Sequence, residues 1–125
     1  MKHTDLQIED YVYHVNKIVK VATLSNSDVT LSVTDNLGTY FAIYNNINPI
    51  PLTPEILEKN GFVKNKDSYL CKLSDKDSKI AIAYSDLYLD IRRTNPIMTI
   101  MVQCMYVHEL QHVLKLCKVD KEIIL

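Results

Sequence analysis

The chain has 125 residues, of which 47% are apolar and 23% are charged, and its formal net charge is −1 at pH 7. This composition predicts a globular domain that can bury its own core, and it excludes a disordered chain. Because the charges nearly cancel, the protein lacks the strong positive field that attracts nucleic acid, so nucleic acid is disfavoured as a partner.

The sequence contains neither a candidate membrane span nor a disulfide framework. No run approaches the roughly 20 apolar residues that a membrane helix needs, and the first residues lead into a charged segment rather than an apolar signal sequence. Cys71, Cys104 and Cys117 are widely spaced and form no Cys-x-x-Cys pair, which disfavours disulfides and a thiolate zinc site. We expect a cytoplasmic protein without membrane contact, whose cysteines serve as small apolar side chains.

The first part of the chain is rich in β-branched and aromatic residues that are interrupted by turn-forming residues. The predicted strands are residues 11–14, 17–24, 28–33 and 40–44. Residues 25–28 (SNSD) and 34–38 (TDNLG) supply turns between them. Short antiparallel strands with tight turns predict a β-rich N-terminal meander or a small barrel.

A short capped helix follows, at residues 53–60 within INPIPLTPEILEKNGF. Thr53 is suited to cap a helix that begins at Pro54, and Glu55 is favourable near the positive helix end. Gly61 fits the left-handed position after the helix, so that Phe62 can fold back onto it.

The second half predicts strands at residues 69–73, 79–84, 87–92 and 98–103, followed by a final helix at about residues 105–118. Alternating apolar residues in the second and third of these strands predict a hairpin with one apolar face, which the final helix must cover. The fold expected is therefore α+β in a single domain, with lobes at about residues 1–52 and 53–125.

The final helix carries His108-Glu109-Leu110-Gln111-His112, the His-Glu-x-x-His pattern of many zinc proteases. In such enzymes the two histidines bind zinc, and the glutamate acts as base on the metal-bound water. This pattern makes His108 and His112 candidate zinc ligands and Glu109 a candidate catalytic base.

Two features of the sequence argue against this zinc site. A third ligand is required, and the candidates, His3, His14, Asp120 and Glu122, are not directed to the helix by anything in the sequence. At about 100° per residue, the apolar positions of the helix gather on one stripe. His108 and His112 fall opposite that stripe, so we expect both to face water or a partner and expect no cofactor, with zinc as the alternative.

Other residues are candidates for binding a partner. Among the eight tyrosines, Tyr40 and Tyr44 lie at a predicted strand, where a ring can cover the core and leave its hydroxyl for a ligand. Arg92 and Arg93 are adjacent at a predicted turn and are candidates for an anion-binding spot. The apolar end of the chain, residues 121–125, either adds an edge strand or docks on another copy, which leaves a homo-oligomer open.

Three stretches carry a resemblance, namely LQIEDYV (residues 6–12), INPIPLTPEILEKNGF (47–62) and YVHELQ (106–111). In this order they resemble a group of small uncharacterised proteins of gut Bacteroidetes bacteria and their phages and mobile elements. Glu9 stands where that group usually has glycine. The group often has glutamine at the position of Glu109 and asparagine at that of His112, which implies that the group as a whole is not made of zinc proteases.

The resemblance implies a small accessory protein of phage or mobile-element origin. Because no catalytic set closes in the sequence, we expect it to be non-enzymatic and to bind a protein or small ligand through the β-rich lobe or the polar face of the final helix. A virion component and an inhibitor of host defence both remain open. The alternative is a minimal zinc hydrolase, and the third hypothesis is a small nucleic-acid-binding barrel.

Overall fold

The computed structural model describes residues 5–24, 29–75, 78–95 and 97–125. Within these residues the fold is α+β, as predicted, with two five-stranded antiparallel sheets and two α-helices. His3 and the predicted turn at residues 25–28 lie outside the described residues.

The chain divides into two compact units. The first consists of Met1–Pro51 and Tyr106–Val113, and the second of Leu52–Met105 and Leu114–Leu125. The final helix therefore contributes residues to both units, and each unit is described by itself below.

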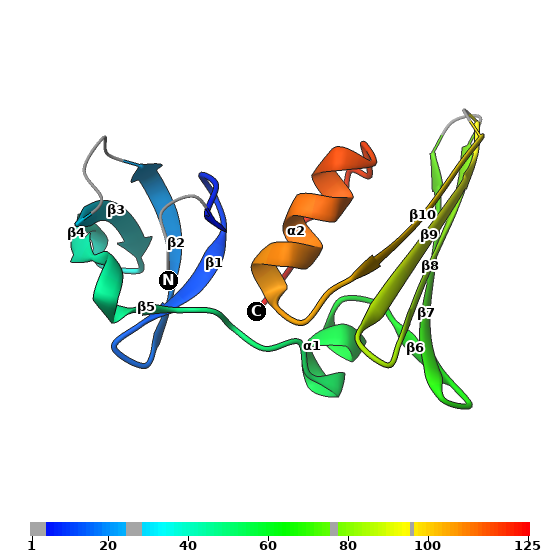
Figure 1. The fold of residues 1–125 in the computed structure, drawn as a ribbon, viewed down its shortest axis with the longest axis horizontal. Helices are drawn as coiled ribbons and strands as arrows, with labels where there is room; N and C mark the ends of the chain where they lie inside the picture. The colour runs from blue at the N-terminus through cyan, green and yellow to red at the C-terminus, as the bar shows by residue number, and fades with distance from the viewer. Residues whose placement is uncertain (1–4, 25–28, 76–77, 96) are drawn as a thin grey trace. The chain divides into compact units, whose positions relative to one another are not determined.

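The sheet of the first unit is a meander, in which β1 to β4 follow one another and β5 returns to pair with β1 (Figure 1). Its strands are β1 (Tyr11–His14), β2 (Lys17–Leu24), β3 (Thr30–Asp35), β4 (Gly38–Ile43) and β5 (Ile47–Asn48). The sheet is open in the order β4-β3-β2-β1-β5, so the small-barrel alternative is wrong. With only two residues, β5 is too short to close a barrel.

The bounds of β1 and β2 agree with the prediction. Those of β3 and β4 are shifted, because the turn predicted at residues 34–38 is only two residues long, at 36–37, so that β3 ends two residues later and β4 begins two residues earlier than predicted. At its other end β4 stops before Tyr44, because Tyr44–Asn46 forms a 3-10 turn. Val15 and Asn16 form the two-residue turn after β1, with φ angles of 48° and 66°. Such turns match the natural twist of paired strands.

Alternate residues of this sheet form the core of the first unit, because side chains along a strand point to opposite faces. The buried cluster consists of Leu6, Val12, Val19, Val21, Leu31, Val33, Ala42, Tyr44 and Ile47.

The second unit begins with helix α1 (Pro54–Lys59), which has the predicted caps. The Ile56 amide donates a hydrogen bond to the Thr53 hydroxyl at 3.3 Å. Gly61 adopts a φ of 87°, and the amide of buried Phe62 donates to the Leu57 carbonyl at 3.0 Å. The predicted helix start and stop are both confirmed.

The second sheet is an antiparallel meander in the order β10-β9-β8-β7-β6. Its strands are β6 (Val63–Asn65), β7 (Ser68–Asp75), β8 (Ser78–Ser85), β9 (Tyr88–Thr94) and β10 (Ile97–Gln103). The predicted hairpin is β8 with β9, where Ile82 lies opposite Ile91. Leu87 was predicted in the strand but lies in the turn, with a φ of 70° that extended strands do not adopt.

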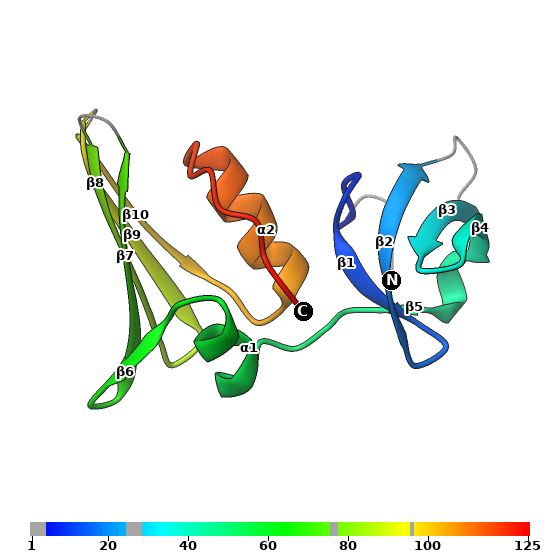
Figure 2. The same cartoon turned by 180° about the vertical axis from the view of Figure 1, so that it is seen from behind.

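Helix α2 (Val107–Leu116) is shorter than predicted at both ends. For residues 121–125 the sequence left open an edge strand or docking on another copy; the chain end forms no strand and docks on α1. The Asn60 side chain donates to the carbonyl of Ile124 at 2.8 Å and accepts from its amide at 2.7 Å. Figure 2 shows the C-terminal segment ending beside α1. Ile123 is 2% exposed and belongs to the core of the second unit, whereas Ile124 is 57% exposed.

The contacts of Asn60 predict a measurable role in stability. Asn60→Ala removes three hydrogen bonds, one to the Ile56 carbonyl and two to Ile124, and should lower the free energy of unfolding by about 2 kcal/mol in urea denaturation. Asn65→Ala, at an exposed position in β6, is the matched control and should change it little. Equal losses in both variants would contradict this role.

Candidate functional site: the polar face of the last helix

The start of helix α2 is joined to the segment at residues 50–51. Tyr106 forms a β-bridge with Pro51, and the Val107 amide donates to the Ile50 carbonyl at 2.8 Å. The Glu109 carboxylate accepts a hydrogen bond from the Tyr106 amide at 3.1 Å. This is the contact that a glutamate in the third helical position makes with the capping residue. Glu109, the candidate catalytic base, therefore serves as part of a helix cap.

Gln111 joins the helix to the segment that enters β1. Its side-chain oxygen accepts from the Tyr11 amide at 2.9 Å, and its side-chain nitrogen donates to the Glu9 carbonyl at 3.1 Å. One amide thus satisfies a donor and an acceptor of the backbone, as a neighbouring strand would. Glu9 itself has a φ of 75°, a conformation in which glycine is the unstrained residue.

His112 contacts the same segment through a buried carboxylate. Its Nε2 lies 2.6 Å from Oδ2 of Asp10, which also accepts from the Gln7 amide at 2.7 Å. Asp10 is buried. Sequence reasoning missed Asp10, because 102 residues separate it from His112 and no local pattern connects them. The resemblance did draw attention to Gln111, which ends the stretch YVHELQ.

His108 and His112 were predicted to face water or a partner, and exposure to water is wrong for His108, which is only 4% exposed. Its ring is stacked on Tyr106, with planes 11° apart and centroids 5.9 Å apart, and meets the His112 ring edge-on at 5.5 Å. A helical wheel identifies residues that share a face, but it cannot show that a polar face packs against another segment.

Burial lowers the pKa of His108 below its ordinary value of 6.5. The neighbouring His112 also lowers it, while the carboxylates of Asp10, Glu109 and Asp5 act in the opposite direction and are outweighed by burial. The ring is therefore neutral at physiological pH. Its Nδ1 is buried and has no hydrogen-bond partner among the described residues, which is an energetic cost in a folded protein.

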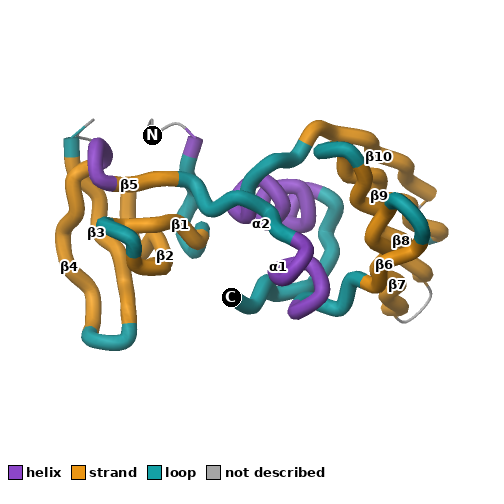
Figure 3. The backbone as a smooth tube through the Cα atoms, turned by 90° about the horizontal axis from the view of Figure 1, so that it is seen from below, coloured by secondary structure: helices purple, strands orange, loops and turns teal. Residues whose placement is uncertain are grey.

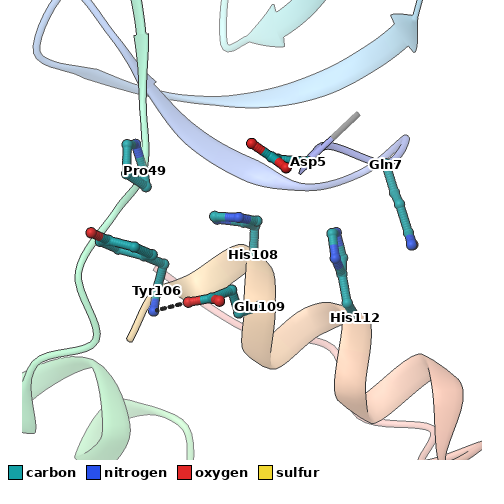
Figure 4. Close-up of a pocket in the computed structure, with 7 residues that line it drawn as sticks. All are labelled: Asp5, Gln7, Pro49, Tyr106, His108, Glu109 and His112. Carbon is teal, nitrogen blue, oxygen red and sulfur yellow. Dashed lines mark hydrogen bonds between the residues drawn. The ribbon is translucent and has the colours of Figure 1, made fainter. Parts of the chain in front are cut away.

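An open pocket of about 570 Å³ lies over this polar face. Figure 4 shows the rings of His108 and His112 rising from α2 toward Asp5 and Gln7, while the Glu109 carboxylate turns back to the Tyr106 amide. The remaining lining residue is Pro49, and no lysine or arginine is among the described residues that line the pocket. The lining thus contains the carboxyl groups of Asp5 and Glu109 and the neutral ring of His108.

The zinc hypothesis gains no third ligand from the structure. Among the described residues, no three His, Cys, Asp or Glu side chains form a group that could hold a metal ion. His14 lies 3.4 Å from the Tyr40 hydroxyl in the first sheet, and Asp120 and Glu122 belong to the second unit.

The predicted binding tyrosines are part of the first unit's packing. Tyr44 is buried in its core, and Tyr40 is partly buried against that core. The Tyr40 hydroxyl contacts Nδ1 of His14, with the ring centroids 5.7 Å apart. Their role as binding residues stays a prediction, and the structure brings neither of them into the pocket lining.

Arg92 and Arg93 lie inside β9 rather than at a turn, so their side chains point to opposite faces of the sheet. Arg92 is exposed and lies 3.5 Å from Asp90. The Arg93 guanidinium donates to the Ser78 hydroxyl and to the carbonyls of Cys117 and Lys118 just after α2. The two arginines therefore do not form one anion-binding spot, although each remains a separate candidate.

The three cysteines are buried and form no disulfide with one another. Burial raises the pKa of the Cys71 and Cys117 thiols, which outweighs the opposing effects of Lys121 and Arg93 respectively. Both thiols are thus held in the unreactive protonated form.

No known protein family, curated protein or solved structure matches the chain significantly. The described helices are too short or too polar to cross a lipid bilayer.

The cap contact of Glu109 can be tested by substitution. Glu109→Ala should lower the free energy of unfolding by about 1 kcal/mol, because the Tyr106 amide loses its acceptor. Glu109→Gln keeps an acceptor oxygen and should retain most of this stability in urea denaturation. If the two substitutions destabilise equally, the carboxylate acts through something other than this hydrogen bond.

The lowered pKa of His108 predicts a loss of stability in acid. The unfolded chain takes up a proton as the pH falls through 6.5, whereas the folded His108 resists protonation, so the unfolded state gains. Thermal melts from about pH 7.5 to about pH 5 should show a shallower decline in melting temperature for His108→Gln than for the wild type. Equal declines would show that His108 does not contribute.

Proposed function

We propose that this protein is a small non-enzymatic accessory protein of phage or mobile-element origin, which acts in the cytoplasm by binding a small ligand over the polar face of α2. The observation that carries the proposal is that two side chains of the His-Glu-x-x-His pattern are already engaged in hydrogen bonds within the fold. Glu109 caps the helix at the Tyr106 amide, and His112 pairs with buried Asp10. A catalytic base would need its carboxylate directed at a metal-bound water instead.

The pocket supports binding because it combines a stacked aromatic surface with polar groups that converge on one space. The Tyr106 and His108 rings are stacked, and Asp5, Gln7 and His112 surround them. Concave sites with a few oriented polar groups are the usual form of ligand pockets. The exposed carboxylate of Asp5 favours a ligand that carries an amine.

The phage or mobile-element part of the proposal is supported by the resemblance at residues 6–12, 47–62 and 106–111. The positive φ of Glu9 is consistent with it, because glycine, usual in the resembling proteins, is unstrained there. Gln111, which the stretch YVHELQ contains, ties the helix to the backbone at Glu9 and Tyr11.

Metal analysis separates this proposal from the zinc hydrolase. Protein made without a histidine tag and dialysed against zinc-containing buffer should retain less than one zinc per chain. One tightly bound zinc per chain that is lost in His112→Ala would contradict the hypothesis of a non-enzymatic protein.

Thermal shift with chosen probes tests the ligand class. Arginine, putrescine and spermidine should raise the melting temperature, whereas inorganic phosphate should not. The shift should disappear in Asp5→Asn and persist in the control Asp120→Asn, which changes an exposed carboxylate in the second unit. Stabilisation by phosphate alone would contradict the proposed ligand chemistry.

A further inference from the structure

Strand β10 ends the sheet of the second unit and pairs only with β9. All of its residues, from Ile97 to Gln103, have partners in β9, and no other described strand lies against its outer edge (Figure 3). An edge strand presents unpaired backbone amides and carbonyls along its free side. The free side of β10 is therefore a template for one more strand.

The inner face of this sheet is also incomplete at β10. In β8 and β9 the inward side chains of Ile80, Ile82, Leu89 and Ile91 are at most 4% exposed. The same rows continue into β10, where Ile100 lies opposite Ile91 and Val102 opposite Leu89. In β10, however, Met98, Ile100 and Val102 are only partly buried. A further strand beside β10 would cover these apolar side chains.

The edge lacks the features that usually prevent strand addition. Proteins protect an edge by keeping it short or by placing charges on it. The edge strand β5 has two residues, and β6 has three with Lys64 among them. The seven residues of β10 carry no charge, and its outward face exposes Ile97 by 89% and Met101 by 67%.

The remaining edge strand, β4, differs from β10 in its core. It is also uncharged and exposes Phe41 by 81%, but its two inward residues are already packed in the first unit. Ala42 is 4% exposed, and Tyr40 packs against the core with its hydroxyl 3.4 Å from Nδ1 of His14. This contrast singles out β10.

We propose that β10 pairs antiparallel with β10 of a second copy of this chain, about a twofold axis at Ile100. Met98 then lies opposite Val102 of the second copy, Thr99 opposite Met101, and Ile97 opposite Gln103. The pairing joins the two five-stranded sheets into one continuous sheet and packs the inner apolar rows of the two β10 strands against each other.

Charge distribution favours a second copy as the occupant. The nearest outward-facing charges, Asp90 and Arg92, lie on β9 and pair with each other at 3.5 Å. In the twofold arrangement both β10 strands separate them from their equivalents, so no like charges become neighbours. The proposal concerns the second unit alone and does not depend on the pocket over α2.

The mass of the full chain in solution tests the pairing. Light scattering after gel filtration should give twice 14.4 kDa for the wild type at high micromolar concentration. The variant Thr99→Lys/Met101→Lys should give 14.4 kDa, because each new lysine lies opposite a lysine of the other copy. Both positions are exposed, so circular dichroism should show an unchanged fold.

A matched control and a charge reversal complete the test. Thr39→Lys/Phe41→Lys makes the same change on the exposed face of β4 and should leave the dimer intact. Mixing the lysine variant with Thr99→Glu/Met101→Glu should restore a species of twice 14.4 kDa. A monomeric wild type, or a dimer that survives the β10 change, would overturn the proposal.

Discussion

In the first unit, the side-chain amide of Gln111 makes the pair of hydrogen bonds to the backbone that a neighbouring strand would make. Gln111 donates to the Glu9 carbonyl and accepts from the Tyr11 amide, so the helix is joined to the backbone at the start of β1. The Tyr11 amide and the Glu9 carbonyl, which would otherwise need separate partners, are thus both satisfied by one side chain. This contact holds the polar face of α2 against the segment that enters β1. On the same face, His108 is buried and His112 contacts Asp10.

That packing changes the chemical meaning of the His-Glu-x-x-His letters. The spacing that would let two histidines share a metal also lets them stack with Tyr106 and reach Asp10. A carboxylate three residues into a helix can act on water or cap the helix, and here Glu109 meets the Tyr106 amide. Two of the side chains that line the pocket, those of Glu109 and His112, therefore also make hydrogen bonds within the fold.

The two sheets differ in how they end. In the first unit, both edge strands contribute a buried residue to the core, Ala42 from β4 and Ile47 from β5. In the second unit, the side chains of Asn60 and Arg93 both bind backbone groups of irregular segments, Asn60 at the chain end and Arg93 just after α2. Met98, Ile100 and Val102 in β10 nevertheless stay only partly buried, which is why that edge suits strand addition.

Local signals in the sequence determined the elements of this fold. Thr53, Pro54 and Gly61 specify α1 because capping and left-handed backbone depend on adjacent residues, and alternating apolar residues specify the strands because side chains alternate with period two. Only the tertiary structure decided the site. The partners of Gln111 and His112 lie about one hundred residues away in the chain, and Arg92 and Arg93 separate only once β9 is extended. Which groups are satisfied, buried or left open to a ligand depends on such distant contacts, and no local pattern encodes them.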